Sequence, residues 1–162
     1  MLLNQNLGAN ASIYNGLVPK DTRALFGPKY ALLRPEFNRY RAASLAGRKK
    51  KEITNLLINF GGGDPDDYIH KILTVMLAIN LPKHVTVSVI FGDIELLRPD
   101  HLELIANISA DVRVFGDISN MAAMLTNTDL VIGAAGSSAW ERCCLGVPSI
   151  IFPIALNQTN IA

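Results

Sequence analysis

From residue 53 onward, short continuous apolar runs alternate with longer stretches in which apolar residues recur at helical spacing. A largely apolar run such as 55–60 is typical of a strand buried on both faces, and glycine or proline marks where such runs end. We therefore predict five strands, at residues 55–60, 85–91, 112–115, 129–132 and 149–152. Helices are predicted from a cap at Asp66 or Asp67 to about 81, and at about 99–108, 118–125 and 139–145, with a further helix opening at Asn157 and Gln158.

Strands that alternate with helices, each strand apolar throughout, indicate a parallel sheet covered by helices on both faces. The sequence thus predicts an α/β fold with a Rossmann-like parallel sheet of about five strands. Right-handed crossovers and the doubly wound pattern predict the strand order third, second, first, fourth, fifth. In that order the strand at 149–152 lies at an edge of the sheet.

The first 52 residues do not follow this rhythm. They carry turn signals at Asn15-Gly16 and Gly27-Pro28, and one apolar stretch at 30–33. We therefore divide the chain into residues 1–52 and a sheet domain at 53–162. The first part holds 10 Lys and Arg against 3 Asp and Glu, and the second holds 5 against 11. The basic run 48–51 has no aromatic platform beside it, so we interpret it as a solvated linker and expect no nucleic acid partner.

Composition narrows the class of protein further. Of the 162 residues, 49% are apolar and 18% are charged, and the mean hydropathy is +0.25, which excludes a disordered chain. No stretch is apolar for long enough to predict a membrane span, and the first residues do not resemble a secretion signal, so a cytoplasmic location is expected. The adjacent Cys143 and Cys144 are interpreted as buried thiols on a helix, neither bridged nor ligating zinc.

Two glycine-rich loops fall at predicted strand ends, where ligands bind in open parallel sheets. One is 61–63, and the other is 133–138, which ends in Ser137 and Ser138 and opens a helix. Glycine lets the backbone approach a ligand closely, and the free N–H groups of a helix start favour an anion, although each loop alone is also an ordinary strand–helix turn. Neither loop matches a dinucleotide fingerprint or a P-loop. The pattern predicts a phosphate-bearing ligand other than NAD, without ATP hydrolysis.

Several side chains near the second loop have two readings each. Glu141 either caps the following helix or accepts hydrogen bonds from ribose hydroxyls. Arg142 either pairs with a surface acid or touches phosphate, and Trp140 is expected in the core rather than as a stacking platform. The three histidines are taken as separate and either exposed or satisfied, so no catalytic residue, metal or cofactor is assigned; they are His70, His84 and His101.

The motifs from Phe115-Gly116-Asp117-Ile118 to Gly136-Ser137-Ser138-Ala139-Trp140-Glu141-Arg142-Cys143-Cys144-Leu145-Gly146 resemble the C-terminal domain of GT-B-fold nucleotide-sugar enzymes. They are particularly similar to the UDP-sugar hydrolases of pseudaminic acid biosynthesis and to their spore coat polysaccharide relatives. Two upstream stretches, at 4–9 and 27–37, fit the same family. A more distant likeness is to the N-acetylglucosaminyltransferase of peptidoglycan synthesis.

This resemblance implies that UDP or a UDP-sugar binds between two Rossmann-like domains. By likeness to the family, the diphosphate lies on Gly136, Ser137 and Ser138, with the cleft loop of Gly61, Gly62 and Gly63, and Glu141 holds the ribose. Uracil is expected at Phe115, Gly116 and Ile118, and the sugar faces Asn157 and Gln158. The implied reaction is attack of water on the anomeric carbon, with UDP as the leaving group.

The chain also departs from the pattern of the family that it resembles. Family members carry an N-terminal domain with a catalytic histidine, so residues 1–52 are expected to be a remnant of that domain and the chain a fragment of the enzyme. Alone, it is expected to bind UDP-sugar without turnover. A GT-B glycosyltransferase domain and a non-catalytic UDP-binding module remain open alternatives. A homo-oligomer is also expected, because the strand at 149–152 leaves an apolar edge.

Overall fold

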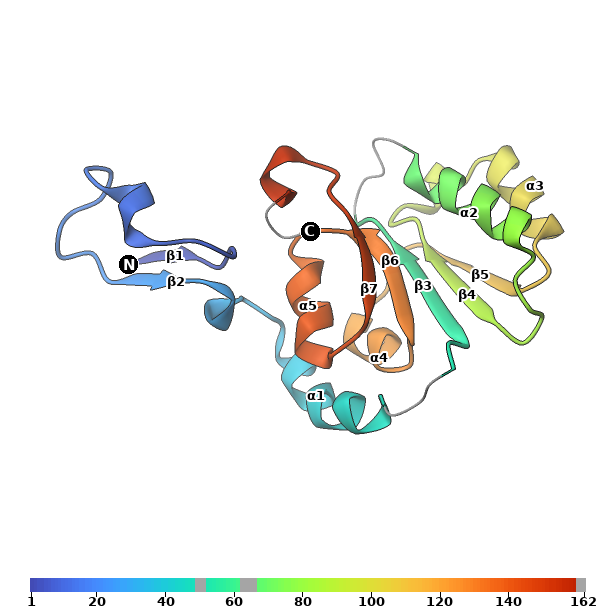
Figure 1. The fold of residues 1–162 in the computed structure, drawn as a ribbon, viewed down its shortest axis with the longest axis horizontal. Helices are drawn as coiled ribbons and strands as arrows, with labels where there is room; N and C mark the ends of the chain where they lie inside the picture. The colour runs from blue at the N-terminus through green and yellow to red at the C-terminus, as the bar shows by residue number, and fades with distance from the viewer. Residues whose placement is uncertain (49–51, 62–66, 160–162) are drawn as a thin grey trace.

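The computed structural model describes residues 1–48, 52–61 and 67–159. Its centre is a parallel five-stranded sheet in the order β5-β4-β3-β6-β7 (Figure 1). This is the predicted order, and the predicted α/β class with a Rossmann-like sheet is confirmed. The strands are β3 (Asn55–Asn59), β4 (Thr86–Ile90), β5 (Asp111–Phe115), β6 (Leu130–Ala134) and β7 (Ser149–Phe152).

Helices cover both faces of the sheet, because alternate side chains of each strand point to opposite sides. In β3, Leu56 and Ile58 join one apolar cluster and Leu57 joins the other. The first cluster is closed by α2 (Tyr68–Ile79) and α3 (Pro99–Asn107), and the second by α1 (Pro35–Gly47), α4 (Met121–Thr126) and α5 (Ser138–Leu145). Two short 3₁₀ turns follow β4 and β7, η3 (Ile94–Leu96) and η4 (Leu156–Gln158).

Helix α1 is not predicted by the sequence pattern. It begins at Pro35, whose fixed φ suits a first helical position, but only Phe37 and Ser44 of its residues are buried. Phe37 enters the cluster beneath α4 and α5, and Ser44 donates to the carbonyl of Leu145 at 2.8 Å. A mostly polar helix lacks the apolar periodicity that sequence analysis relies on.

Arg48 is not part of a solvated linker, which corrects the interpretation of the basic run. Its guanidinium donates to the carbonyls of Leu145 at 3.1 Å, Thr128 at 2.6 Å and Leu125 at 2.8 Å, and to the hydroxyl of Ser44 at 2.9 Å. These carbonyls close the C-terminal ends of α4 and α5, where backbone oxygens lack helical partners. Residues 49–51 lie outside the described part of the chain.

The N-terminal residues form a small parallel sheet of β1 (Leu2–Asn4) and β2 (Ala24–Phe26), with η1 (Ala11–Tyr14) between them and η2 (Pro28–Tyr30) after them. The rings of Tyr14 and Phe26 stack at 5.6 Å on this unit. Figure 1 shows it beside the larger sheet, joined to it through the segment that enters α1. No helix in the described ranges is both long and apolar enough to cross a membrane.

The two cysteines lie on α5, but the expectation that both are buried is wrong. Cys143 is exposed and Cys144 is partly buried, and both are free thiols. Helix α5 presents Ala139, Arg142 and Leu145 to the interior, and Cys143 falls between these positions on the outer side.

Candidate functional site

The two glycine loops follow neighbouring strands, as the predicted strand order requires. Asn59, the last residue of β3, pairs with Gly133 of β6. A Cβ on Gly133 would stand 2.1 Å from the carbonyl oxygen of Asn59, so the strands approach too closely for any other residue. Gly61 follows β3 with a φ of +80°, and its N–H donates to the side chain of Asn59 at 2.8 Å. Gly62 and Gly63 lie outside the described residues.

The second loop leads into the start of α5. Ala139 donates to the carbonyl of Gly136 at 2.9 Å, and Trp140 donates to that of Ser137 at 3.0 Å. Within the described ranges, the N–H groups of Gly136, Ser137 and Ser138 have no recorded acceptor. Open N–H groups at a helix start, aligned with the positive end of the helix dipole, suit an anionic ligand.

A cavity of about 380 Å³ opens at this loop. It brings Gly136 and Ser137 together with Gln158. It also takes in side chains that sequence reasoning did not assign: the predicted core residue Trp140 is only partly buried and lines it, as do Gln5 and Asn6 after β1. The lining is completed by Ala135.

Both glutamines at this cavity are held by their side-chain oxygens. Gln5 Oε1 accepts the N–H of Leu32 at 2.9 Å, and Gln158 Oε1 accepts the N–H of Ile154 at 3.0 Å. With the oxygens occupied, each amide group keeps its two N–H donors for another partner. The cavity therefore combines backbone, hydroxyl and amide donors, which suits a ligand rich in oxygen acceptors.

Glu141 lies in the first turn of α5, and its side chain is 22% exposed. Burial raises the pKa of its carboxyl group, while the charges of Arg34 and Arg142 act in the opposite direction. Its recorded ion pair is a long one, 3.8 Å from Arg34. In the described part of the chain its carboxylate accepts no capping hydrogen bond from a backbone N–H, so its acceptor positions are open to a ligand.

Arg142 forms no ion pair with a surface acid among the described residues. It is 3% exposed, and its guanidinium donates to the hydroxyl of Ser138 and to the carbonyl of Ala134. Phe115 and Ile118, expected near uracil, pack against the apolar cluster that α1 and α5 also enter. Gly116, between them, lies against Ile94, with Cβ atoms that would stand 3.8 Å apart.

The chain is similar to several known proteins. The chain is 32% identical over 147 residues to the UDP-2,4-diacetamido-2,4,6-trideoxy-beta-L-altropyranose hydrolase of Campylobacter jejuni, which covers 90% of this chain and 49% of the hydrolase. It is 28% identical over 148 residues to the spore coat polysaccharide biosynthesis protein SpsG of Bacillus subtilis, covering 90% of this chain and 42% of SpsG. The chain is a homologue of these two proteins.

An uncharacterized Methanocaldococcus jannaschii protein, MJ1062, is 30% identical over 132 residues, covering 80% of this chain and 27% of MJ1062. The crystal structure of Acinetobacter baumannii MurG superposes with a TM-score of 0.64 at 18% identity, over 99% of this chain and 48% of MurG, and supports the GT-B-like fold. No family model matches. The chain spans about half, or less, of the length of the curated relatives it matches.

Two histidines of the present chain lie together, whereas the sequence analysis took all three as separate. The rings of His70 and His101 are 5.6 Å apart, and both lie close to Asp67. His84 stands apart, 3.3 Å from Glu52 on the surface. The sequence did not predict the pair because it forms only where the first turns of α2 and α3 meet.

The chemistry of this histidine cluster does not fit a metal ion, although its possible ligand atoms lie within 4.8 Å of one another. Both carboxylate oxygens of Asp67 accept from Arg98, at 3.2 and 2.8 Å. Nδ1 of His101 accepts the N–H of Arg98 at 3.3 Å, so the neutral ring carries its proton on Nε2, the nitrogen that faces Asp67. Burial lowers the pKa of His101, which favours that neutral ring. Arg98 thus organises a network that joins two helices.

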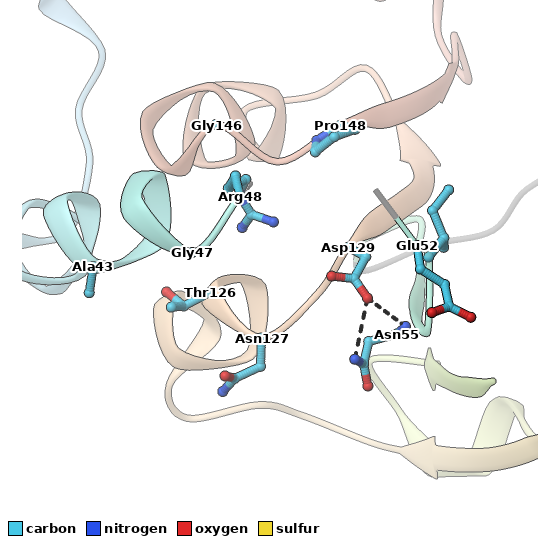
Figure 2. A pocket seen from close by; sticks show the side chains of 11 residues that line it. Ala43, Gly47, Arg48, Glu52, Asn55, Thr126, Asn127, Asp129, Gly146 and Pro148 are labelled. Atoms are coloured by element: carbon cyan, nitrogen blue, oxygen red, sulfur yellow. Dashed lines mark hydrogen bonds between the residues drawn. The ribbon is translucent and has the colours of Figure 1, made fainter. Parts of the chain in front are cut away.

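A larger cavity, about 740 Å³, lies at the amino-terminal ends of β3, β6 and β7 (Figure 2). Its charged side chains are already engaged. Arg48 donates to the helix carbonyls, and Glu52 lies 3.3 Å from His84. Asp129 accepts from the backbone and side chains of Thr54 and Asn55 at 2.9 to 3.3 Å. Burial alone would raise the pKa of Asp129, but these hydrogen bonds outweigh it and lower the pKa. Because these charged groups are already engaged, this cavity is a weaker ligand site than the donor-rich cavity at α5.

Proposed function

We propose that this chain forms the UDP-sugar-binding half of a nucleotide-sugar hydrolase. The observation that carries the proposal is the cavity at α5, where Gly136, Ser137, Gln158 and Gln5 converge. Glu141, which follows the lining residue Trp140 on the same helix, adds a carboxylate with open acceptor positions. The homologous Campylobacter protein bears the name of a UDP-sugar hydrolase, and that substrate class supplies the anionic and acceptor-rich groups that this cavity suits.

In this proposal the diphosphate lies on the N–H groups and hydroxyls of 136–138, with Gly61 at the neighbouring strand end. Glu141 accepts hydrogen bonds from the ribose hydroxyls, and uracil contacts Phe115, Gly116 and Ile118. The sugar lies toward Asn157 and Gln158. Gln5 and Trp140 extend this last subsite, since both line the cavity with Gln158.

The proposed reaction is attack of water on the anomeric carbon, with cleavage of the bond to the β-phosphate oxygen and departure of UDP. Here the described residues contribute ground-state binding of the nucleotide. General acid–base help adds a factor of about 10²–10⁴ to such a step. The site offers no obvious base, because Glu141 is assigned to the ribose and His70 and His101 belong to the Arg98 network.

Isothermal titration of the chain with UDP, ADP and UDP-N-acetylglucosamine tests the nucleotide site. We expect UDP to bind more tightly than ADP. A matched control is Asn127→Ala, which alters the large cavity of Figure 2 and should leave the affinity for UDP unchanged. Failure of the unsubstituted chain to bind UDP would overturn the proposal.

Product analysis tests the catalytic part. The chain alone should release UDP from a UDP-sugar no faster than buffer does. Turnover that is lost in His70→Ala or His101→Ala would show instead that the histidine cluster is a catalytic centre. Transfer of the sugar to an acceptor would favour a glycosyltransferase over a hydrolase.

A further inference from the structure

The side chain of Arg142 forms hydrogen bonds at both ends of the loop that precedes α5. Its side chain leans back toward the helix start, as helical side chains do, and reaches both ends of the loop. One nitrogen, Nη2, donates to the carbonyl of Ala134 at 2.7 Å, at the end of β6, and Nη1 donates to the hydroxyl of Ser138 at 3.1 Å, at the start of α5. A single planar guanidinium therefore sets the distance between the strand end and the helix start.

Arg142 has no direct ion-pair partner among the described residues, and the charge of its neighbour Glu141 acts on it only through space. The residue is 3% exposed, and among the ion pairs of the described residues none includes it. Its Nε is buried without a hydrogen-bond partner. An arginine stays protonated in proteins, and a buried charge without a counter-ion is costly, so a fold that retains one has a reason to do so.

The contact with Ser138 also orients its hydroxyl. Because the oxygen accepts a hydrogen bond from Arg142, the hydroxyl hydrogen is directed elsewhere and remains a donor. The open N–H groups of Gly136 and Ser137 lie in the same loop. Two kinds of donor, backbone N–H groups and a hydroxyl, are thus gathered with one buried cation around the loop before α5.

We infer that Arg142 is a positioning residue for a diphosphate, and that the bound diphosphate supplies further negative charge near a buried guanidinium that has no direct ion pair. The inference rests on the proposed function and adds to it. Arg142 acts through the loop, by holding Ala134 and Ser138, and through its charge beneath the open N–H groups. It makes binding of the diphosphate, rather than of the nucleoside, depend on a residue that solvent hardly reaches.

Two variants separate charge from geometry. Arg142→Lys keeps the charge but cannot hold both ends of the loop, because an ammonium lacks the planar fork. Arg142→Met removes the charge as well. We expect affinity for UDP to fall about tenfold in Arg142→Lys and about a hundredfold in Arg142→Met, as expected for losing one and then two charge-assisted interactions. Binding of uridine, followed by NMR titration, should change less than about twofold in either variant, since uridine carries no phosphate.

The ligand comparison keeps the inference apart from the proposed function and from a folding defect. If the unsubstituted chain binds inorganic pyrophosphate but not UDP, the proposed function fails, and loss of pyrophosphate binding in Arg142→Lys still supports the role of Arg142. If it binds neither, both fail. Thermal melting identifies any variant that does not fold. Should Arg142→Met be unfolded, Arg142→Lys and Ser138→Ala decide the question. Folded variants that bind UDP like the unsubstituted chain, or lose uridine and UDP equally, overturn the inference.

Discussion

The side chain of Glu141 is partly buried, and its ion-pair partner Arg34 is distant. This arrangement has opposite consequences for the stability of the fold and for the binding of a ligand. Burial raises the pKa of its carboxyl group above the ordinary value of 4.5. Because the folded protein then holds the proton more tightly than the unfolded chain, the stabilising contribution is present below 4.5 and is lost as the pH rises through the raised pKa. At neutral pH the ionised carboxylate therefore weakens the empty fold while offering acceptors to a ribose.

The first prediction is that Glu141→Gln binds UDP at least about tenfold more weakly, because hydrogen bonds to a charged acceptor contribute about 1.5–3 kcal/mol each. Its thermal midpoint at neutral pH should equal or exceed that of the unsubstituted chain, and the difference should vanish below pH 4.5. Glu36→Gln is the matched control, since Glu36 also pairs with Arg34, at 3.1 Å, but lies on α1 and is not assigned to the ribose. Unchanged UDP binding in Glu141→Gln would contradict the ribose role and favour the interpretation that Glu141 only stabilises the start of the helix.

A second prediction concerns Gly133, where β3 and β6 come closest. Gly133→Ala places a Cβ 2.1 Å from a backbone oxygen, which no side-chain movement relieves. Overpacking of this kind costs about 1–3 kcal/mol and occasionally more. Gly136→Ala is the control, because its added Cβ would meet only the amide of Gln158, at an ordinary 3.6 Å. Urea denaturation should show a lower free energy of unfolding for Gly133→Ala alone; equal midpoints would contradict the close strand contact.

At the scale of whole elements, Arg48 joins three helix ends that are distant in sequence. Replacing it with methionine leaves the carbonyls of Leu125, Thr128 and Leu145 without this donor. Because these groups are partly reached by water, we expect a loss of about 2 kcal/mol in the free energy of unfolding, near the middle of the range for a hydrogen bond to a charged group. Arg39→Met, an exposed change on the same helix, should be neutral. A neutral Arg48→Met would mean that the three helix ends hold together without the guanidinium.

The sheet could be predicted from sequence because its strands are continuous apolar runs bounded by glycine or proline. Their order followed from the handedness of the crossovers. Helix α1 and Arg48 could not be predicted, since a polar helix has no apolar period and the partners of Arg48 are backbone carbonyls, which every residue has. In the site, the loop of 136–138 could be predicted, because its own glycine and serine residues are typical of an anion-binding loop. Gln5 could not be predicted, because its place at the cavity depends on where the β1–β2 unit lies relative to α5.

At the scale of the whole molecule, the outer edge of β7 and the face beside it remain uncovered in the described structure. An apolar groove of about 560 Å³ runs from α2 across β3 and β6 to β7. Its margins carry Val75, 58% exposed, Ile79, 60% exposed, and Ile150, 48% exposed. An unpaired strand edge beside exposed apolar side chains favours pairing with a further chain.

The expected occupant is a second copy of this chain, related by a two-fold axis along β7, since a closed symmetric contact covers both copies of the groove at once. Light scattering after gel filtration should therefore give about twice the 17.6 kDa mass of the chain. Ile150→Lys places a charge at the edge strand and should shift the protein to the monomer. Leu102→Lys, on the exposed side of α3 and outside the groove, should not. A monodisperse monomer of the unsubstituted chain at tens of micromolar would mean that the groove and the β7 edge stay open to solvent or are filled by a different partner.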